Sequence, residues 1–191
     1  MTQKRFSRRG LWTLFLVVAF PIHVWAFLMF FEDYAWITRR TNAWDAVGVG
    51  AYGLLFAFAE SLFVLLGAVL LSLLLPRKWP ESKRIALVGW LVWVTAIWGI
   101  LGQLYFLWNL PIPDLIYRFL RSQAHPARIL YGLLLLPVLI TILLPVYGVL
   151  KSEKFTRTTL AIFERVAILT TLYIVLDLIS LIIIFIRNIA T

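Results

Sequence analysis

The sequence predicts an all-α integral membrane protein, a bundle of five transmembrane helices with one short amphipathic helix at the membrane interface. The 191-residue chain is 62% hydrophobic and only 14% charged, which is far too apolar for the surface of a soluble domain. Five apolar runs are each long enough to cross a bilayer, whose ~30 Å hydrocarbon core needs about 20 helical residues. Most Lys and Arg residues lie between these runs, as is typical of multi-pass membrane proteins.

The apolar run at residues 51–75 is the clearest of the five. Glu60 is its only ionisable side chain, and a helix of this length rises roughly 37 Å at ~1.5 Å per residue. A carboxylate near the middle of a bilayer costs on the order of 3 kcal/mol. We therefore expect Glu60 to face protein or water, or to carry a proton.

The apolar runs predict transmembrane helices at residues 11–31, 51–75, 85–108, 129–150 and 161–186. A basic start such as the one before residue 11 is also found in signal peptides. The first run, however, is longer than a typical signal h-region and lacks a small-x-small cleavage site at its end. We expect a retained helix, and a single membrane domain that covers residues 1–191.

Prolines interrupt two of these helices. Pro21 lies near the middle of the first, and Pro137 and Pro145 lie in the fourth. Each proline lacks the N–H that would bond the carbonyl four residues earlier, so that carbonyl needs another partner within a membrane. Transporters use such carbonyls along a substrate path, and static bundles also contain them. We favour the static interpretation for the fourth helix.

The segments outside the spans differ in character. Residues 32–50 mix acidic, basic and aromatic side chains, so we predict a loop that lies along one membrane interface. Residues 114–123 begin with Asp114, which is suited to cap a helix. Their apolar residues fall on one helical face, with Arg118 and Arg121 on the other. This pattern predicts a short interfacial helix.

Three tryptophans, Trp90, Trp93 and Trp98, form a broad stripe on the third helix. Such a stripe could line a ligand pocket. Inside a helix bundle, however, aromatic residues at helical spacing more often pack against neighbouring helices. We favour packing for these three residues.

The distribution of basic residues predicts the orientation of the chain. If the N-terminus is inside, the inner segments 1–10, 76–84 and 151–157 hold eleven Lys and Arg, whereas the outer segments hold six. The positive-inside rule then places the N-terminus in the cytoplasm and the C-terminus outside the cell membrane. The inner basic residues that we expect to meet lipid head groups are Arg8, Arg9, Arg77, Lys78, Lys83, Arg84, Lys151 and Lys154.

Polar side chains inside the spans are the candidate functional residues. Counted along their helices, His23, Glu60 and Asp177 lie at about the same depth, and Gln103 is a further polar residue in the third helix. If the first, second and fifth helices are neighbours, His23 could bridge both carboxylates and relay protons or bind a cation. The alternative, which we favour, is that each group is satisfied locally or by a partner subunit and serves assembly.

Several classes of function are excluded or disfavoured. The sequence has no HExxH, GxSxG, P-loop or dinucleotide-binding motif, so we assign no catalytic residue. It has no cysteine, which excludes disulfides and thiolate ligands. One histidine and two carboxylates are suitable ligand types but carry no metal motif, so we predict no metal site and leave the cofactor open. The net charge of +9 reflects the segments beside the membrane rather than nucleic-acid binding.

The leading functional hypothesis is a non-catalytic integral membrane subunit of a larger complex, with the bilayer and other membrane proteins as its partners. The small size, the missing catalytic motifs and the lack of a soluble domain between the spans support it. The second hypothesis is a small transporter or a proton- or cation-coupled carrier that uses His23, Glu60 and Asp177. A third, a membrane-embedded enzyme that acts on lipid, stays open because few polar groups suffice for lipid chemistry.

The five-helix plan, with the N-terminus inside and the C-terminus outside, is similar to the membrane domain that precedes the extracellular catalytic domain in lipoteichoic acid synthase-like enzymes. It is an analogy of topology, since no residue motif accompanies it and the sequence has no such catalytic domain. The size is also similar to that of the substrate-binding membrane components of vitamin importers, which usually have six helices. Neither resemblance carries a functional residue over to this chain.

Overall fold

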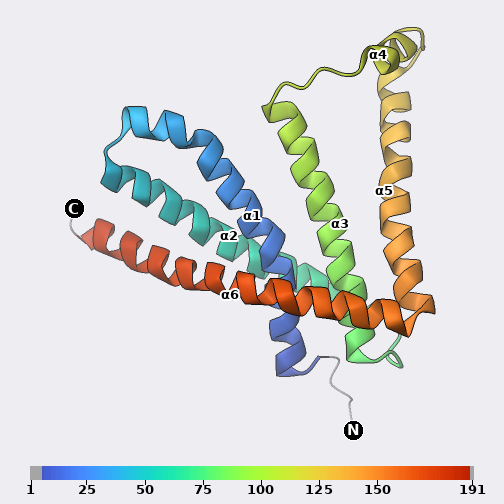
Figure 1. Cartoon of the computed structure of the whole chain (residues 1–191), viewed down its shortest axis with the longest axis horizontal. Helices are drawn as coiled ribbons and strands as arrows, with labels where there is room; N and C mark the ends of the chain where they lie inside the picture. The colour runs from blue at the N-terminus through green and yellow to red at the C-terminus, as the bar shows by residue number, and fades with distance from the viewer. Residues whose placement is uncertain (1–5, 190–191) are drawn as a thin grey trace.

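The computed structural model describes residues 6–189, and these residues form helices and short connections without any β-strand. Lys4 and Arg5, which the orientation argument includes, lie outside the described residues. Five helices are long and apolar enough to cross a membrane, so the predicted class of helical membrane bundle is confirmed. In chain order the helices are α1 (Arg8–Arg40), α2 (Ala43–Ser72), α3 (Glu81–Leu107), α4 (Asp114–Arg121), α5 (Pro126–Lys151) and α6 (Glu153–Ile189) (Figure 1).

The connection between α1 and α2 is much shorter than predicted. Because α1 continues to Arg40 and α2 begins at Ala43, the predicted interface loop over residues 32–50 is wrong. Asn42 makes the tight turn possible, since its side-chain oxygen accepts a hydrogen bond from the backbone N–H of Asp45 at 2.9 Å and caps α2. The polar and aromatic residues of this segment therefore lie on two helical ends that extend past the apolar runs.

The last helix also begins earlier than predicted. α6 starts at Glu153 instead of residue 161, and only Ser152 separates it from α5. The Ser152 hydroxyl accepts a hydrogen bond from the backbone N–H of Phe155 at 3.1 Å, as an N-cap residue does. The polar stretch after Lys151 is therefore the first part of a helix, because a single cap residue suffices to end α5 and begin α6 in a new direction (Figure 1).

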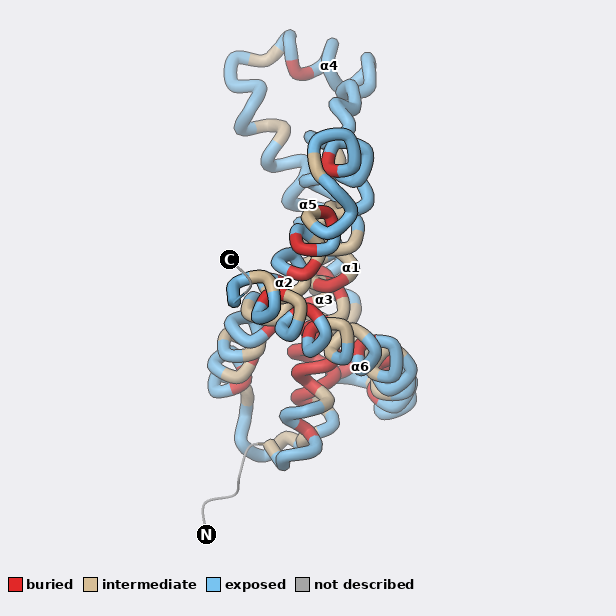
Figure 2. The backbone as a smooth tube through the Cα atoms, turned by 90° about the vertical axis from the view of Figure 1, so that its left-hand side faces the viewer, coloured by how far each residue is buried: buried red, intermediate tan, exposed pale blue. Residues whose placement is uncertain are grey.

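The core lies where α1 meets α3 and α6. α1, α2 and α6 pack on one another, α3 packs on α1, and α5 packs on α3 (Figure 1). The first half of α1 is the best buried segment, with Val17 and Val18 completely buried (Figure 2). Gly89 lets α3 approach closely, because a Cβ at this position would collide with the ring of Phe163 on α6.

Pro21 creates a free acceptor in α1 that α3 uses. A proline at this position leaves the carbonyl of Val17, four residues earlier, without its usual helical N–H. The indole N–H of Trp93 on α3 donates to this carbonyl at 2.8 Å. α1 stays one helix through Pro21, and the proline gives α3 an anchoring point on it.

The other two tryptophans of the α3 stripe contact two further helices. Trp90 donates its indole N–H to the Thr159 hydroxyl of α6 at 3.0 Å. Trp98 donates to the Thr141 hydroxyl of α5 at 2.9 Å. The stripe is therefore a packing element in the structure, since its three rings connect α3 to α1, α5 and α6.

α5 packs least of the five spans. It continues as one helix through Pro137 and Pro145, so neither proline breaks it. Among the residues described in α5, Val149 alone is buried. An apolar helix with so little protein around it is suited to contact lipid or another membrane protein.

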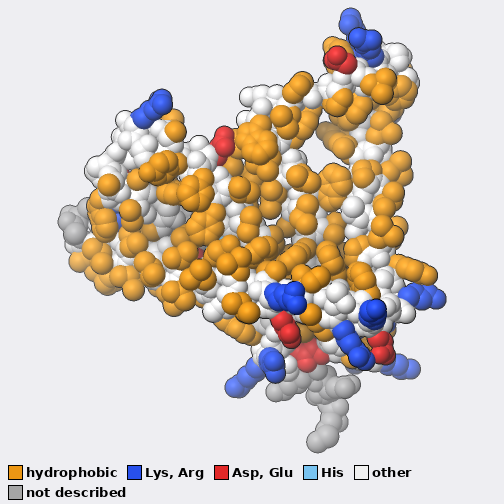
Figure 3. All heavy atoms as spheres, in the orientation of Figure 1, with side chains coloured by type: hydrophobic (Ala, Val, Ile, Leu, Met, Phe, Trp, Pro, Cys, Tyr) orange, Lys and Arg blue, Asp and Glu red, His pale blue; other side chains and the backbone are white. Residues whose placement is uncertain are grey.

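Charged side chains gather at the helix ends and leave an apolar face between them (Figure 3). The largest basic group lies at the end that contains the start of α1, the α2–α3 turn and the α5–α6 junction (Figures 1 and 3). Smaller groups lie at the α1–α2 turn and around α4. Alternate helix connections thus lie at opposite ends of an apolar middle, which fits a multi-pass membrane protein.

Candidate functional site

His23 of α1 and Asp177 of α6 form a buried pair inside the spans. Nε2 of His23 lies 3.0 Å from one carboxylate oxygen of Asp177 and 3.2 Å from the other. Nδ1 of His23 lies 2.8 Å from the backbone carbonyl oxygen of Ala19. His23 is 0% exposed and Asp177 is 3% exposed, so each group depends on the other rather than on water for its hydrogen bonds.

The acceptors around His23 define how many protons the pair holds. A carbonyl oxygen only accepts hydrogen bonds, so Nδ1 must carry a proton. Nε2 faces carboxylate oxygens, and a hydrogen bond there needs a second proton, either on Nε2 or on Asp177. With both protons the pair is neutral overall, which is the state that burial in a low-dielectric interior favours. The second proton therefore lies in the hydrogen bond between Nε2 and the carboxylate.

An aromatic ring stacks on the imidazole. Tyr173 of α6 stacks on the His23 ring with the ring centres 5.7 Å apart. Phe20 and Phe27 of α1 contact the Tyr173 ring in turn. Sequence reasoning missed Tyr173, although it stands four residues before Asp177 and therefore on the same helical face. Tyr173 therefore covers one face of the imidazole, and Phe20 and Phe27 support the Tyr173 ring.

An apolar groove of about 450 Å³ adjoins the pair between α1, α2 and α6. Asp177, Arg8 and Trp12 contribute to its lining, and the remaining lining residues are Leu, Ile and Phe. The groove therefore suits an acyl chain or an apolar side chain rather than a polar solute.

Glu60 does not join His23 and Asp177. Its side chain is exposed on α2 and makes no hydrogen bond or ion pair with another residue of the described part of the chain. Of the predicted cluster, the structure therefore brings together His23 and Asp177 but not Glu60. The second ring nitrogen of His23 bonds the Ala19 carbonyl instead of a second carboxylate.

Glu60 lines a different groove, between α1 and α2. This groove has a volume of about 360 Å³ and includes Asp33 as a second carboxylate. Trp25, Phe30 and Phe56 contribute aromatic walls, and no Lys or Arg is among its lining residues. The groove is therefore apolar along its length and acidic at two positions.

Gln103, the other predicted polar residue, is exposed on α3 and forms no hydrogen bond within residues 6–189. α3 diverges from α1 and α2 toward this end (Figure 1). Gln103 therefore takes no part in the His23–Asp177 pair.

The predicted head-group residues differ in exposure. Arg8, Arg9, Arg77, Lys78, Lys151 and Lys154 are exposed, and Lys83 is half-buried. Arg84 is only 5% exposed, and one nitrogen of its guanidinium donates to the backbone carbonyls of Arg77 at 3.0 Å and Trp79 at 2.6 Å. Arg84 thus stabilises the α2–α3 turn instead of facing lipid head groups.

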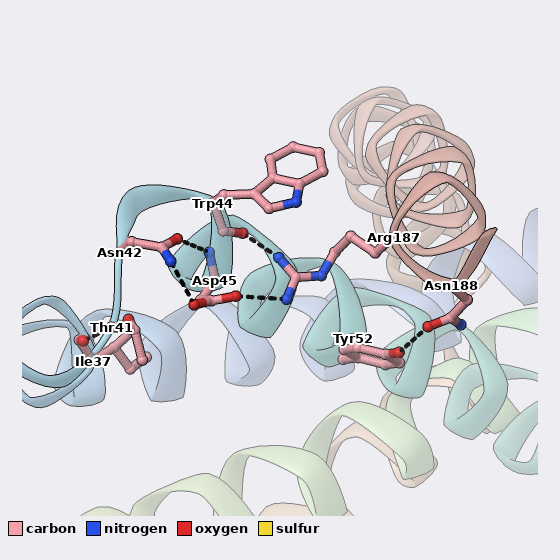
Figure 4. Close-up of polar contacts among 8 residues, drawn as sticks. All are labelled: Ile37, Thr41, Asn42, Trp44, Asp45, Tyr52, Arg187 and Asn188. Atoms are coloured by element: carbon pink, nitrogen blue, oxygen red, sulfur yellow. Dashed lines mark hydrogen bonds and ion pairs between the residues drawn. The ribbon is translucent and has the colours of Figure 1, made fainter. Parts of the chain in front are cut away.

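A second polar contact at the far end of α6 was not apparent from the sequence. Arg187 reaches across to the start of α2, where it pairs with Asp45 at 2.8 Å and donates to the backbone carbonyl of Trp44 (Figure 4). Tyr52 donates to the side-chain oxygen of Asn188 at 3.4 Å in the same region (Figure 4). These contacts hold the end of α6 against α2, and no local spacing could have predicted them.

The described residues contain no group of three or more His, Cys, Asp or Glu side chains arranged to hold a metal ion. No family model, curated protein or solved structure matches this chain. The two polar features within the spans of the described residues that bear on function are the buried His23–Asp177 pair and the exposed Glu60.

Proposed function

We propose that this chain is a non-catalytic integral membrane subunit of a larger complex. In this proposal a transmembrane helix of another subunit occupies the groove between α1 and α2 and places a Lys or Arg side chain against Glu60. The observation that carries the proposal is the exposure of Glu60 within a span, without a partner among the described residues.

The depth of Glu60 in α2 supports a partner for its carboxylate. Glu60 lies 12 residues before Ser72, the nearer end of the helix, which corresponds to roughly 18 Å at ~1.5 Å per residue. A Glu side chain is too short to reach the membrane surface from there. An isolated carboxylate at this depth is unfavourable by about 3 kcal/mol, and a basic side chain from a second protein removes this cost.

The charge of the groove favours a cationic partner group. Glu60 and Asp33 both line it, and none of the basic residues within the described part of the chain is among the lining residues. A partner helix with one basic residue would find a carboxylate to pair with and apolar walls for its neighbouring side chains. Intramembrane charges typically pair in this way across helices.

The test is the mass of the protein extracted from its native membrane in a mild detergent. We expect a stoichiometric complex heavier than the 22.1 kDa chain, which Glu60→Lys dissociates by charge repulsion and Glu60→Gln weakens. Glu164→Lys is the matched control, because Glu164 is also exposed but lies on α6 outside this groove. A monodisperse monomer from native membranes, or a complex that survives Glu60→Lys, would contradict the proposal.

A second candidate function is a proton- or cation-coupled carrier, and the buried His23–Asp177 pair favours it. The hydrogen bond between His23 and Asp177 needs a proton on one of the two groups, and the pair lies within the spans beside an apolar groove. In proteoliposomes with an internal pH-sensitive dye, this function requires proton flux that Asp177→Asn abolishes and Glu60→Gln leaves intact. Equal flux in wild type and Asp177→Asn would exclude a carrier role for the pair.

The proposed orientation places the start of α1, the α2–α3 turn and the α5–α6 junction on the cytoplasmic side of the cell membrane. The excess of basic residues at this end supports it. Cysteines introduced at Lys78 and Arg118, which are both exposed, test the orientation with a membrane-impermeant thiol reagent. In intact cells we expect the reagent to label Arg118→Cys and not Lys78→Cys.

A further inference from the structure

A basic cavity of about 570 Å³ lies at the junction of α3, α5 and α6. Lys83 of α3, Lys151 of α5 and Arg157 of α6 line it, together with the hydroxyl-bearing Ser82. We propose that this cavity binds the phosphate group of an anionic membrane lipid. The proposal is independent of the groove at Glu60, which lies between α1 and α2.

The cationic groups of the cavity are largely free to bind an anion. Arg157 is paired with Glu153, the only acidic residue among the described residues that line the cavity, but at 3.5 Å and with side chains that are 82% and 92% exposed. Such an exposed pair is weak and easily exchanged. Lys151 is exposed and makes no hydrogen bond or ion pair with another described residue.

Lys83 is positioned by the protein rather than neutralised by it. Its ammonium group donates to the backbone carbonyl of Leu150 at 3.2 Å and lies 5.0 Å from the centre of the Trp79 ring. An ammonium group has three donors, so donors remain for a phosphate oxygen. With one acidic and three basic lining residues, the cavity carries a formal excess of two positive charges.

The walls of the cavity favour a lipid over a free phosphate ion. Val149, Leu150 and Leu160 line it beside the basic residues. The cavity is lined by residues of the α5–α6 junction, and this junction lies at the end of the molecule where the apolar face gives way to charged residues (Figures 1 and 3). From Lys151 the exposed apolar surface of α5 leads away into the span, so the acyl chains of a bound lipid have a surface to lie on. Basic pockets between helices at the cytoplasmic side commonly bind lipid head groups in this way.

Native mass spectrometry of the purified chain with defined lipids tests the proposal. We expect the first phosphatidylglycerol to bind about tenfold more tightly than phosphatidylcholine with the same acyl chains, given two excess charges near the head group. The triple variant Lys83→Gln, Lys151→Gln and Arg157→Gln should lose this preference. The matched control is a triple variant of three arginines at or near α4, Arg118→Gln, Arg121→Gln and Arg128→Gln, which should keep it.

A second variant separates loss of binding from loss of folding. Lys83→Gln also removes the bond to Leu150, whereas Lys151 and Arg157 are exposed. The double variant Lys151→Gln and Arg157→Gln should therefore keep wild-type helicity and thermal stability, with most of the preference lost. Equal binding of the two lipids by wild type, or an unchanged preference in the double and triple variants, would overturn the proposal.

A competition arm identifies the source of the phosphate group. Phosphatidylglycerol that stays bound in millimolar inorganic phosphate supports the lipid, because its acyl chains add apolar contacts. Displacement of the lipid by inorganic phosphate would overturn the lipid assignment and identify a site for a free phosphate ion.

Discussion

The His23 imidazole and the Asp177 carboxylate lie 3.0 Å apart, although the residues are 154 positions apart in the sequence. This contact joins α1 to α6 in the interior of the spans. Both side chains of the His23–Asp177 pair are buried. The ion pairs Arg157–Glu153 and Arg187–Asp45, by contrast, are largely or partly exposed. The pair adds a buried polar contact to the apolar packing between these two helices.

Asp177→Ala should destabilise the folded protein by about 3 kcal/mol, because it leaves a buried imidazole without its partner. Asp177→Asn should cost only about 1 kcal/mol, since the amide N–H can donate to Nε2 of a neutral imidazole. The free energy of unfolding in mixed detergent micelles measures both. Equal losses in the two variants would show that the hydrogen bond to His23 contributes little.

Trp93→Phe should cost about 1 kcal/mol by removing the donor to the Val17 carbonyl. The loss should shrink in a Pro21→Ala background, because an alanine in this place supplies the helical N–H that proline lacks. A double-mutant cycle on the free energy of unfolding isolates this coupling. Additive effects of the two substitutions would mean that the proline and the indole act independently.

Gly89→Ala should destabilise the protein by about 1–3 kcal/mol through overpacking. A Cβ at Gly89 would collide with Phe163 and lie 3.1 Å from Val17, whereas a Cβ at Gly99 on the same helix would have no neighbour within 4 Å. Gly99→Ala is therefore the control, and it should stabilise α3 by about 0.5–1 kcal/mol. Thermal unfolding of both variants in one detergent gives the comparison, and equal shifts of the same sign would contradict the packing described here.

The sequence could predict the depth of the polar residues in the membrane but not which side of its helix each side chain faces in the bundle. Position along a helix follows directly from the rise per residue, and this is why His23 and Asp177 could be expected at one level. The rotation of each helix about its axis depends on all of its neighbours. Glu60 lies in the apolar span of α2, yet its side chain faces outward. Because this span is apolar on every side, its sequence contains no periodic pattern that would predict which way Glu60 faces.

The helix ends were harder to predict than the spans. Hydropathy marks where a chain is apolar, whereas a helix ends at a capping residue. Asn42 and Ser152 each cap the start of a helix. The segments around them are rich in polar residues, and this composition predicted loops. The Arg187–Asp45 contact depends on such a helical extension of α2 at one end of the molecule, so it could not be predicted from a loop.

Arg187→Gln should loosen the end of α6 without unfolding the core. The Asp45 contact is partly exposed, with side-chain exposures of 23% and 42%, so its loss should cost at most about 1 kcal/mol. Hydrogen exchange should accelerate over the last turns of α6 and the first turn of α2. Arg157→Gln is the control, and faster exchange over the same segments in this variant would argue against a local effect of Arg187.

We propose that the groove between α1 and α2 binds a helix of another subunit through Glu60. The most direct measurement is photo-crosslinking in native membranes from a benzoylphenylalanine at Phe56, which lines this groove. The control position is Leu136, which is 58% exposed on α5. We predict one discrete crosslinked protein from Phe56 that is absent from Leu136 and disappears in the Glu60→Lys background. Lipid adducts alone at Phe56, or a crosslinked protein that persists with Glu60→Lys, would contradict the claim.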